Sequence, residues 1–279
     1  MDQPPVIGGR PGNPVSTEPA AAIAFLTAAL AEEYRDGPFV VIVRTREEIS
    51  RWLRDPIPGA EGIQVEGLIG DPEVWALAAQ GAVPIPLDVI LSDPATEFSA
   101  LYRLVDARIV RPVRVTLPAT PGFLKALRLA ASLQIPVRLL PGQPGAEALA
   151  ELASAANFYL RDPMVDAPVE FFHSVFAALR GMGGGTLWTI LEQDPAVFSH
   201  RDLDGHVLHP PDFVETRWAR LINEGAECVT CQWQSLCAGY FKWPDPAYDC
   251  AGVKQLFASL ESAADEITRD LASRELSAS

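Results

Sequence analysis

Short apolar runs alternate with helix-forming stretches along most of the first 180 residues. Runs rich in Val, Ile and Leu without polar alternation are typical of strands buried on both faces. The stretches between them carry good helix formers and often a Pro near the first turn. We predict strands at 39–43, 64–69, 86–91, 113–117, 137–140 and 157–161. We predict helices at 20–35, 47–54, 72–80, 93–105, 121–133, 146–156 and 168–180.

Strands that alternate with helices of about ten residues indicate βαβ units and a parallel sheet. The sequence therefore predicts an α/β fold. The periodicity alone fits two architectures, an open doubly wound sheet and a partial (β/α) barrel.

The pattern changes near residue 182, at the breaker Met182-Gly-Gly-Gly185. A strand is predicted at 186–191, a hairpin turn at Asp204-Gly205, and a closing helix at 251–273. We therefore predict three parts of the chain: a flexible N-terminal arm (1–18), a βα-repeat domain (19–181) and a smaller C-terminal domain (182–279).

The charge balance excludes some classes of partner. The chain has 22 Lys and Arg against 36 Asp and Glu, a net charge of −14. Such an acidic chain is poorly suited to nucleic-acid backbone or an anionic membrane surface. Residues 1–18 lack a basic region followed by an apolar stretch, and no apolar run approaches the length of a membrane span, so we expect a cytoplasmic protein.

All four cysteines lie between residues 228 and 250, in the pattern Cys228-x2-Cys231-x5-Cys237-x12-Cys250. Four clustered thiols in a chain without a secretion signal indicate a metal site rather than disulfides. Four thiolates can hold a [4Fe–4S] cluster or one zinc ion. Only the first pair has the short spacing of a zinc knuckle, and the longer gaps favour the larger cluster. The aromatic segment 238–248 could shield such a cofactor.

In these residues the sequence resembles the SPASM extension of radical SAM enzymes. The stretch CVTCQWQSLCAGYF and the later cysteine match its C-x2-C-x5-C…C motif. The resemblance implies that Cys228, Cys231, Cys237 and Cys250 ligate one auxiliary [4Fe–4S] cluster. Gly239 matches the glycine that follows the third ligand. The segment Asp204-Gly205-His206-Val207 resembles the hairpin that precedes it.

The resemblance also implies a partial (β/α) barrel ahead of the extension, which the alternation over 39–180 fits. Two family features are missing. No cysteine precedes residue 228, so the CxxxCxxC loop that follows the first barrel strand in radical SAM enzymes is absent; after 39–43 this chain has Arg44-Thr-Arg-Glu-Glu48. Pro210 stands where the hairpin would supply a cysteine to a first auxiliary cluster. We therefore expect a degenerate member that cannot cleave S-adenosylmethionine reductively.

Three functions follow from these observations. The first is an accessory iron–sulfur protein in the maturation of a peptide or cofactor, acting by electron transfer, peptide binding or as a heterodimer subunit beside a complete radical SAM enzyme. The second is an enzyme that uses the barrel for non-radical chemistry. The third is a structural zinc protein that acts as an interaction module.

Other polar residues are candidates for a ligand site. Strand ends of the predicted barrel could present Asp88, Arg114, Thr116, Arg138 or Gln143 to a ligand. His200, His206 and His209 lie close together in sequence, so they could form a second metal site or proton relay, or a polar rim on the predicted hairpin.

Overall fold

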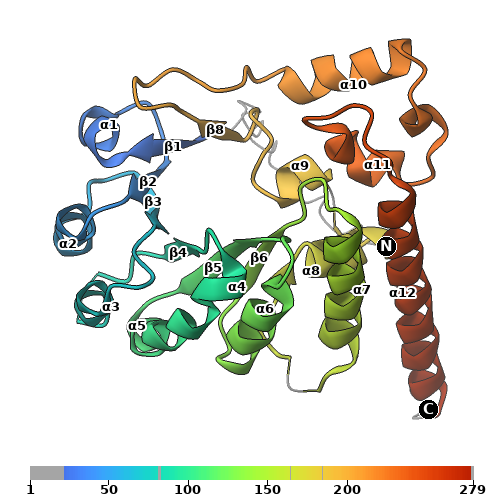
Figure 1. Cartoon of the computed structure of the whole chain (residues 1–279), viewed down its shortest axis with the longest axis horizontal. Coiled ribbons are helices and arrows are strands. Elements are labelled where there is room, and N and C mark those ends of the chain that lie inside the picture. Colours follow the sequence, from blue (N-terminus) through green and yellow to red (C-terminus); the bar gives the residue numbers. More distant parts are fainter. Residues whose placement is uncertain (1–21, 81–82, 164, 184, 278–279) are drawn as a thin grey trace, which may run out of the picture.

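The computed structural model describes residues 22–80, 83–163, 165–183 and 185–277. In these ranges one sheet of eight parallel strands has the order β7-β6-β5-β4-β3-β2-β1-β8. The strands are β1 (Ile23–Thr27), β2 (Phe39–Val43), β3 (Ala60–Glu66), β4 (Leu87–Ile90), β5 (Val113–Pro118), β6 (Val137–Leu140), β7 (Val169–Glu170) and β8 (Phe198–His200). The sheet curls into a half-barrel, which confirms the α/β class and the partial barrel (Figure 1).

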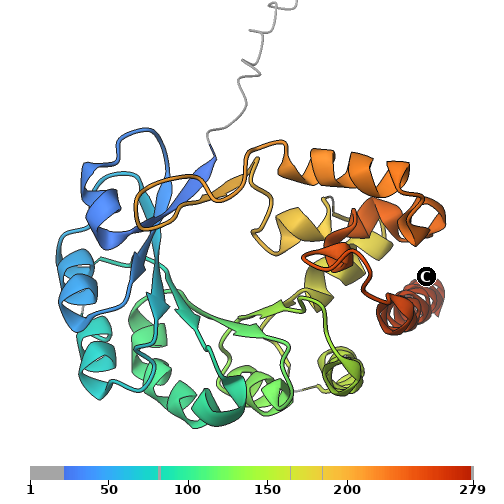
Figure 2. The same cartoon turned by 45° about the horizontal axis from the view of Figure 1, so that its top comes forward.

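Helices follow the strands and cover the convex face of the sheet (Figure 2). The α-helices of the βα region are α1 (Ala28–Glu33), α2 (Arg46–Arg54), α3 (Pro72–Ala78), α4 (Pro94–Glu97), α5 (Val105–Val110), α6 (Phe123–Ser132), α7 (Ala146–Arg161) and α8 (Phe172–Leu179). Several begin at a side-chain cap that satisfies a free backbone N–H: Thr45 forms a capping box with Glu48, and Asp71 and Asp93 each precede a proline at the first helical position.

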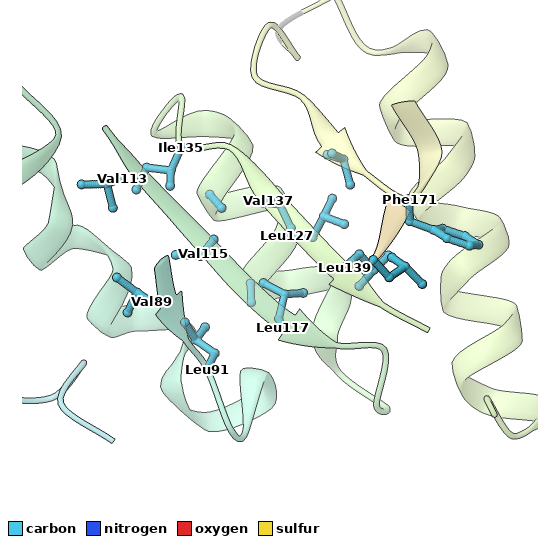
Figure 3. Packing of buried hydrophobic residues seen from close by; sticks show 14 of the residues in the cluster. Val89, Leu91, Val113, Val115, Leu117, Leu127, Ile135, Val137, Leu139 and Phe171 are labelled. Carbon is cyan, nitrogen blue, oxygen red and sulfur yellow. The ribbon is translucent and has the colours of Figure 1, made fainter. Parts of the chain in front are cut away.

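The core lies between the strands and this outer layer of helices. Val89, Val115 and Val137 on neighbouring strands are fully buried, and Leu127 of α6 lies against β5 and β6 (Figure 3). Strands covered in this way need no polar alternation, which is why they are visible in the sequence as apolar runs.

The first strand of the barrel differs from the prediction. A helix was expected over 20–35, but β1 occupies Ile23–Thr27 and only α1 is helical. The Ala-rich segment has high helix propensity. In the fold, however, β1 pairs with β2 on one side and with β8 on the other, and Ala24, Phe25 and Leu26 are almost fully buried. Tertiary burial overrides the local preference. The strand at 39–43 is therefore the second strand of the sheet.

Four other predicted elements need correction. The predicted strand at 157–161 is the last part of α7, and the predicted strand at 186–191 contains the short helix α9 (Leu187–Ile190). The helix predicted at 168–180 is preceded by β7, and the one at 93–105 is divided into α4, a 3-10 helix, η1 (Phe98–Leu104), and the start of α5. The predicted flexible arm lies outside the described residues.

The C-terminal part of the chain packs beside the barrel. It contains α10 (Phe213–Asn223), α11 (Gln234–Cys237), the closing helix α12 (Ala251–Ser277) and the 3-10 helices η2 (Glu227–Thr230) and η3 (Tyr240–Lys242). The long helix α12 packs on α7 and α8 (Figure 1). A turn at Asp204-Gly205 is confirmed by the antiparallel bridge between Arg201 and Val207.

Hydrogen bonds tie this C-terminal part to the barrel. Gln143 donates to the carbonyls of Phe241 (3.0 Å) and Asp245 (2.7 Å), and the Tyr248 hydroxyl donates to the carbonyl of Pro144 at 2.7 Å. β8 also comes from beyond residue 182 yet completes the barrel sheet. The domain boundary near residue 182 stays a prediction. None of the helices in the described ranges has the length and apolar character that a bilayer crossing requires.

Candidate metal centre

The four cysteines line one small pocket between α10, α11 and α12. Cys228 lies on η2, Cys231 directly follows it, Cys237 ends α11 and Cys250 directly precedes α12. Cys228 and Cys250 are buried and the other two are partly buried, and none of the four forms a disulfide. Short helical turns thus bring to one place four thiols that are spread over 23 positions of the chain.

The separation of the sulfur atoms bears on which metal group the four thiols could hold. In a tetrahedral zinc site with Zn–S bonds of about 2.3 Å, all sulfurs lie about 3.8 Å apart. Among the described residues, no three cysteine sulfurs come within 4.8 Å of one another. A cubane spreads its four thiolates more widely, because each binds a different iron. Four thiols can hold a [4Fe–4S] cluster, and a single zinc ion would need the sulfurs to come closer together than they lie here.

The turn after Cys237 needs a residue without a side chain. Ala238 and Gly239 have left-handed backbone conformations (φ 45° and 73°). A Cβ on Gly239 would lie 2.6 Å from Cδ1 of Leu221. This turn also brings the backbone N–H groups of Tyr240 and Phe241 to the Cys237 sulfur, where they stabilise a thiolate.

Without a metal, the site disfavours thiolates. Burial raises the pKa of Cys237 to about 11, although the two N–H groups oppose this, and burial raises the pKa of Cys250 to about 12. Burial also raises the pKa of Cys228. Metal ligation requires deprotonated sulfur, so loading of this site must release protons that the thiols otherwise retain.

Aromatic rings close the pocket. Trp233 and Phe241 each pack on Phe257 of α12, with ring centroids 5.7 and 6.0 Å apart, and Trp218 of α10 also lines the pocket. Tyr240 instead packs on Trp188 of α9, at 5.1 Å. Rings of this size exclude water from whatever the thiols bind.

A second polar cluster lies inside the half-barrel. Arg114 and Arg138 each contact Asp88, at 2.8 and 2.6 Å, and each also contacts Glu192. The Thr116 hydroxyl donates to Asp88 at 2.6 Å and accepts from Nε of Arg138 at 2.9 Å. The charges balance and the groups satisfy one another, so this cluster acts as a fixed internal plug.

The structure thus brings together four of the five strand residues that the sequence singled out. Gln143 is the exception, because it holds the Phe241–Asp245 segment instead. The sequence did not point to Glu192. This residue lies in a loop, with a positive φ of 58°, and nothing in the local pattern indicates that its carboxylate contacts two arginines. Only the presence of unpaired arginines on adjacent strands could have suggested a carboxylate partner.

A pocket of about 400 Å³ opens above this plug, at the carboxyl ends of the strands. Glu66, Trp188 and Trp243 line it together with two of the three clustered histidines, His200 and His209. Nε2 of His200 donates to the carbonyl of Glu192 at 3.1 Å, and burial lowers the pKa of this imidazole.

The third clustered histidine lies apart from the other two. His206 is exposed and lies 3.4 Å from Asp202, and Asp204 joins them in a group of neighbouring ligand atoms. The carboxylate of Asp202 accepts the backbone N–H groups of Asp204 and His206, so the tight turn itself accounts for this grouping. The polar rim on the hairpin is thus the better description of His206, and the three histidines do not converge.

Comparison with known proteins gives one likeness of fold. No family model and no curated protein matches the sequence. The solved structure of histidine-tagged anSMEcpe with bound AdoMet, an anaerobic sulfatase-maturating radical SAM enzyme, superposes with a TM-score of 0.50 at 10% identity. The match covers 91% of this chain and 100% of that chain. The protein therefore has the partial-barrel fold of radical SAM enzymes, and at this identity the likeness extends to the fold alone.

Proposed function

We propose that this protein is an accessory iron–sulfur protein, related to SPASM-type radical SAM maturases, that holds one [4Fe–4S] cluster and does not cleave S-adenosylmethionine. The convergence of Cys228, Cys231, Cys237 and Cys250 on one dry pocket carries the proposal. All four protein ligands would be used by one cubane, which leaves no iron open to a substrate.

The barrel mouth supports the second part of the proposal. Reductive cleavage of S-adenosylmethionine needs an iron with a free site, and radical SAM enzymes supply it from three cysteines after the first strand. Here the first strand is β1, and the chain continues as Ala28-Ala-Leu-Ala-Glu-Glu33, without a cysteine. The pocket at the mouth has no cysteine lining either, and its floor includes Arg138 and Glu192 of the plug.

The net charge of the protein and the proposed cluster together support a role beside a complete radical SAM enzyme. A cluster fully ligated by protein can pass single electrons, and a net charge of −14 favours a partner or peptide with basic character. We propose that the protein works as an electron-transfer, peptide-binding or heterodimer subunit in the maturation of a peptide or cofactor.

Metal content tests the cluster. Anaerobically prepared protein should be brown and contain about four iron and four sulfide per chain if the cluster is a cubane. A colourless protein with one zinc would replace the cluster by the structural zinc alternative. The variant Cys231→Ala should lose the iron, whereas Ser235→Ala, an exposed change on the adjoining helix α11, should retain it.

Product analysis tests the lack of radical chemistry. Reduced, iron-replete protein is incubated with S-adenosylmethionine and dithionite, and 5′-deoxyadenosine is measured against the iron-free Cys231→Ala variant. We expect no catalytic product. Turnover above the variant would show that these four cysteines alone build a radical site, and the accessory role would be wrong.

A further inference from the structure

A buried lysine joins the two ends of the cysteine segment. Lys242 is only 6% exposed, and its Nζ lies 2.8 Å from Oε1 of Glu227, the residue before Cys228. The same Nζ donates to the carbonyl of Tyr248 at 2.6 Å, two residues before Cys250. One ammonium therefore connects the side chain of Glu227, beside the first cysteine, with the backbone of Tyr248, close to the last cysteine.

The Tyr248 carbonyl places this charge close to a cysteine. Its oxygen also accepts a weak hydrogen bond from Sγ of Cys250 at 3.9 Å, so the lysine nitrogen and the cysteine sulfur converge on one atom. The ammonium lowers the cost of a thiolate at both Cys228 and Cys250. In a site from which Trp233 and Phe257 exclude water, such a charge is weakly screened.

Two lysines share one carboxylate beside the cysteine pocket. Lys254 of α12 contacts the other oxygen of Glu227, so two ammonium groups face one carboxylate. Hydrogen bonds from Lys242 and then Lys254 lower the pKa of Glu227 to about 2, and it stays ionised. Burial is the largest influence on the pKa of Lys242 and lowers it, but the hydrogen bond to Glu227 and the nearby charges of Cys250, Glu227 and Cys228 together outweigh burial, so the pKa is raised.

We propose that Lys242 is the internal counter-ion of the cluster: it raises the reduction potential of the cluster and makes it an electron acceptor. This inference rests on the proposed iron–sulfur function. Four thiolates around a [4Fe–4S]²⁺ core would together carry a charge of −2, and one electron from a reductant, dithionite in the test below, would change this to −3 without making or breaking a bond. A fixed positive charge beside the thiolates stabilises the more negative state and so favours reduction.

Three charge variants test the proposal. The iron-loaded proteins are titrated with dithionite under argon, and the potential is read from absorbance and electron paramagnetic resonance. Lys242→Met keeps the unbranched chain up to the ε position and removes the charge, so the potential should become more negative. Glu227→Gln removes the negative charge and should shift it in the opposite direction. Lys254→Met should act like Lys242→Met but more weakly, because Lys254 is 34% exposed.

Shifts of opposite sign in Lys242→Met and Glu227→Gln would distinguish an electrostatic role of Lys242 from a structural one. General loosening of the pocket would shift both reduction potentials in the same direction. Equal potentials in wild type, Lys242→Met and Glu227→Gln, all with full iron, would overturn the inference and leave the proposed function intact. Wild-type protein that binds no iron would overturn both. If Lys242→Met fails to bind iron, the test rests on Glu227→Gln. The inference is then wrong unless the reduction potential of Glu227→Gln is higher than that of the wild type.

Discussion

Gly239 is the residue at which the cysteine site depends most directly on backbone conformation. Alanine there must adopt a φ of 73° and place its Cβ against Leu221, which α10 holds in the core of this region. We expect Gly239→Ala to lower iron content and to destabilise the protein by more than the ~1 kcal/mol of backbone strain alone. Iron analysis and thermal melting measure both effects.

Gly225 provides the matched control for this substitution. It has a similar φ of 68°, but an added Cβ meets nothing within 4 Å. Gly225→Ala should therefore show the strain cost with normal iron content. Equal behaviour of the two variants would mean that the contact with Leu221 has no part in forming the site.

The buried plug of the barrel should be sensitive to loss of one partner. Arg138→Met leaves Asp88 and Glu192 with Arg114 as the remaining arginine of the plug. Breaking a buried ion pair from one side typically costs about 3–5 kcal/mol. The free energy of unfolding, measured by urea denaturation, should fall by an amount in that range.

An exposed ion pair supplies the comparison for the plug. Arg44 and Glu66 are partly exposed (48% and 28%) and lie 2.8 Å apart. Arg44→Met should cost at most about 1 kcal/mol, because water screens exposed charges. If both variants lose the same small amount, the plug does not contribute to stability as a buried network.

The raised thiol pKa values predict slow chemistry in the metal-free protein. Cys237 and Cys250, with pKa values near 11 and 12, remain protonated at pH 8. Since the thiolate is the nucleophile, iodoacetamide should modify both far more slowly than in the urea-unfolded chain, and the rate should rise about tenfold per pH unit up to pH 10. Mass spectrometry of the labelled peptides measures each site, and labelling at the unfolded-chain rate at pH 8 would contradict the raised pKa values.

At the scale of elements, the sequence predicted the parallel strands best. The run at 137–140 coincides with β6, and 39–43 with β2, because strands covered on both faces need uninterrupted apolar residues. β1 was not predicted because the alanines on either side of it favour a helix locally, and only its pairing with β2 and β8 makes it a strand. Neighbours far away in the chain are not visible in a local pattern.

The candidate site was predictable for a different reason. Four cysteines with defined spacing require no knowledge of the tertiary fold, and they meet around one pocket. Lys242 and Glu192 were not predictable, because each owes its role to partners that only the folded chain brings near. Charged residues are usually solvated, so the burial of Lys242 and the partial burial of Glu192 have no local signature.

Close packing of α12 on α7 is an element-scale feature that can be tested. A Cβ on Gly252 would lie 2.4 Å from Cδ1 of Leu149. Gly252→Ala should destabilise the protein by about 1 kcal/mol or more through overpacking. Adding Leu149→Ala should relieve the clash, so the two changes together should cost less than the sum of the single changes in a double-mutant cycle. Strict additivity would show that the helices do not approach this closely.

At the scale of the whole molecule, the sheet and the cysteine region should respond differently to loss of the metal. The sheet has its own apolar core, whereas the segment from η2 to the start of α12 consists of short turns around the four thiols. Metal-binding energy is folding energy for such a segment. We therefore expect Cys231→Ala to lower stability in the C-terminal part and to leave the barrel largely unchanged.

Hydrogen exchange followed by mass spectrometry tests this on the full chain. In Cys231→Ala, amides over residues 227–250 should exchange much faster than in the iron-loaded protein, and those of β2 to β6 should keep their protection. Ser235→Ala serves as the control and should leave both regions protected. The increase in exchange should be limited near Phe241 and Ala238. Their carbonyls accept hydrogen bonds from Gln143 and Trp188, and these bonds do not depend on the metal. Unchanged exchange over 227–250 in a variant without iron would mean that the barrel alone orders the cysteine region, and that the cluster has no structural part in it.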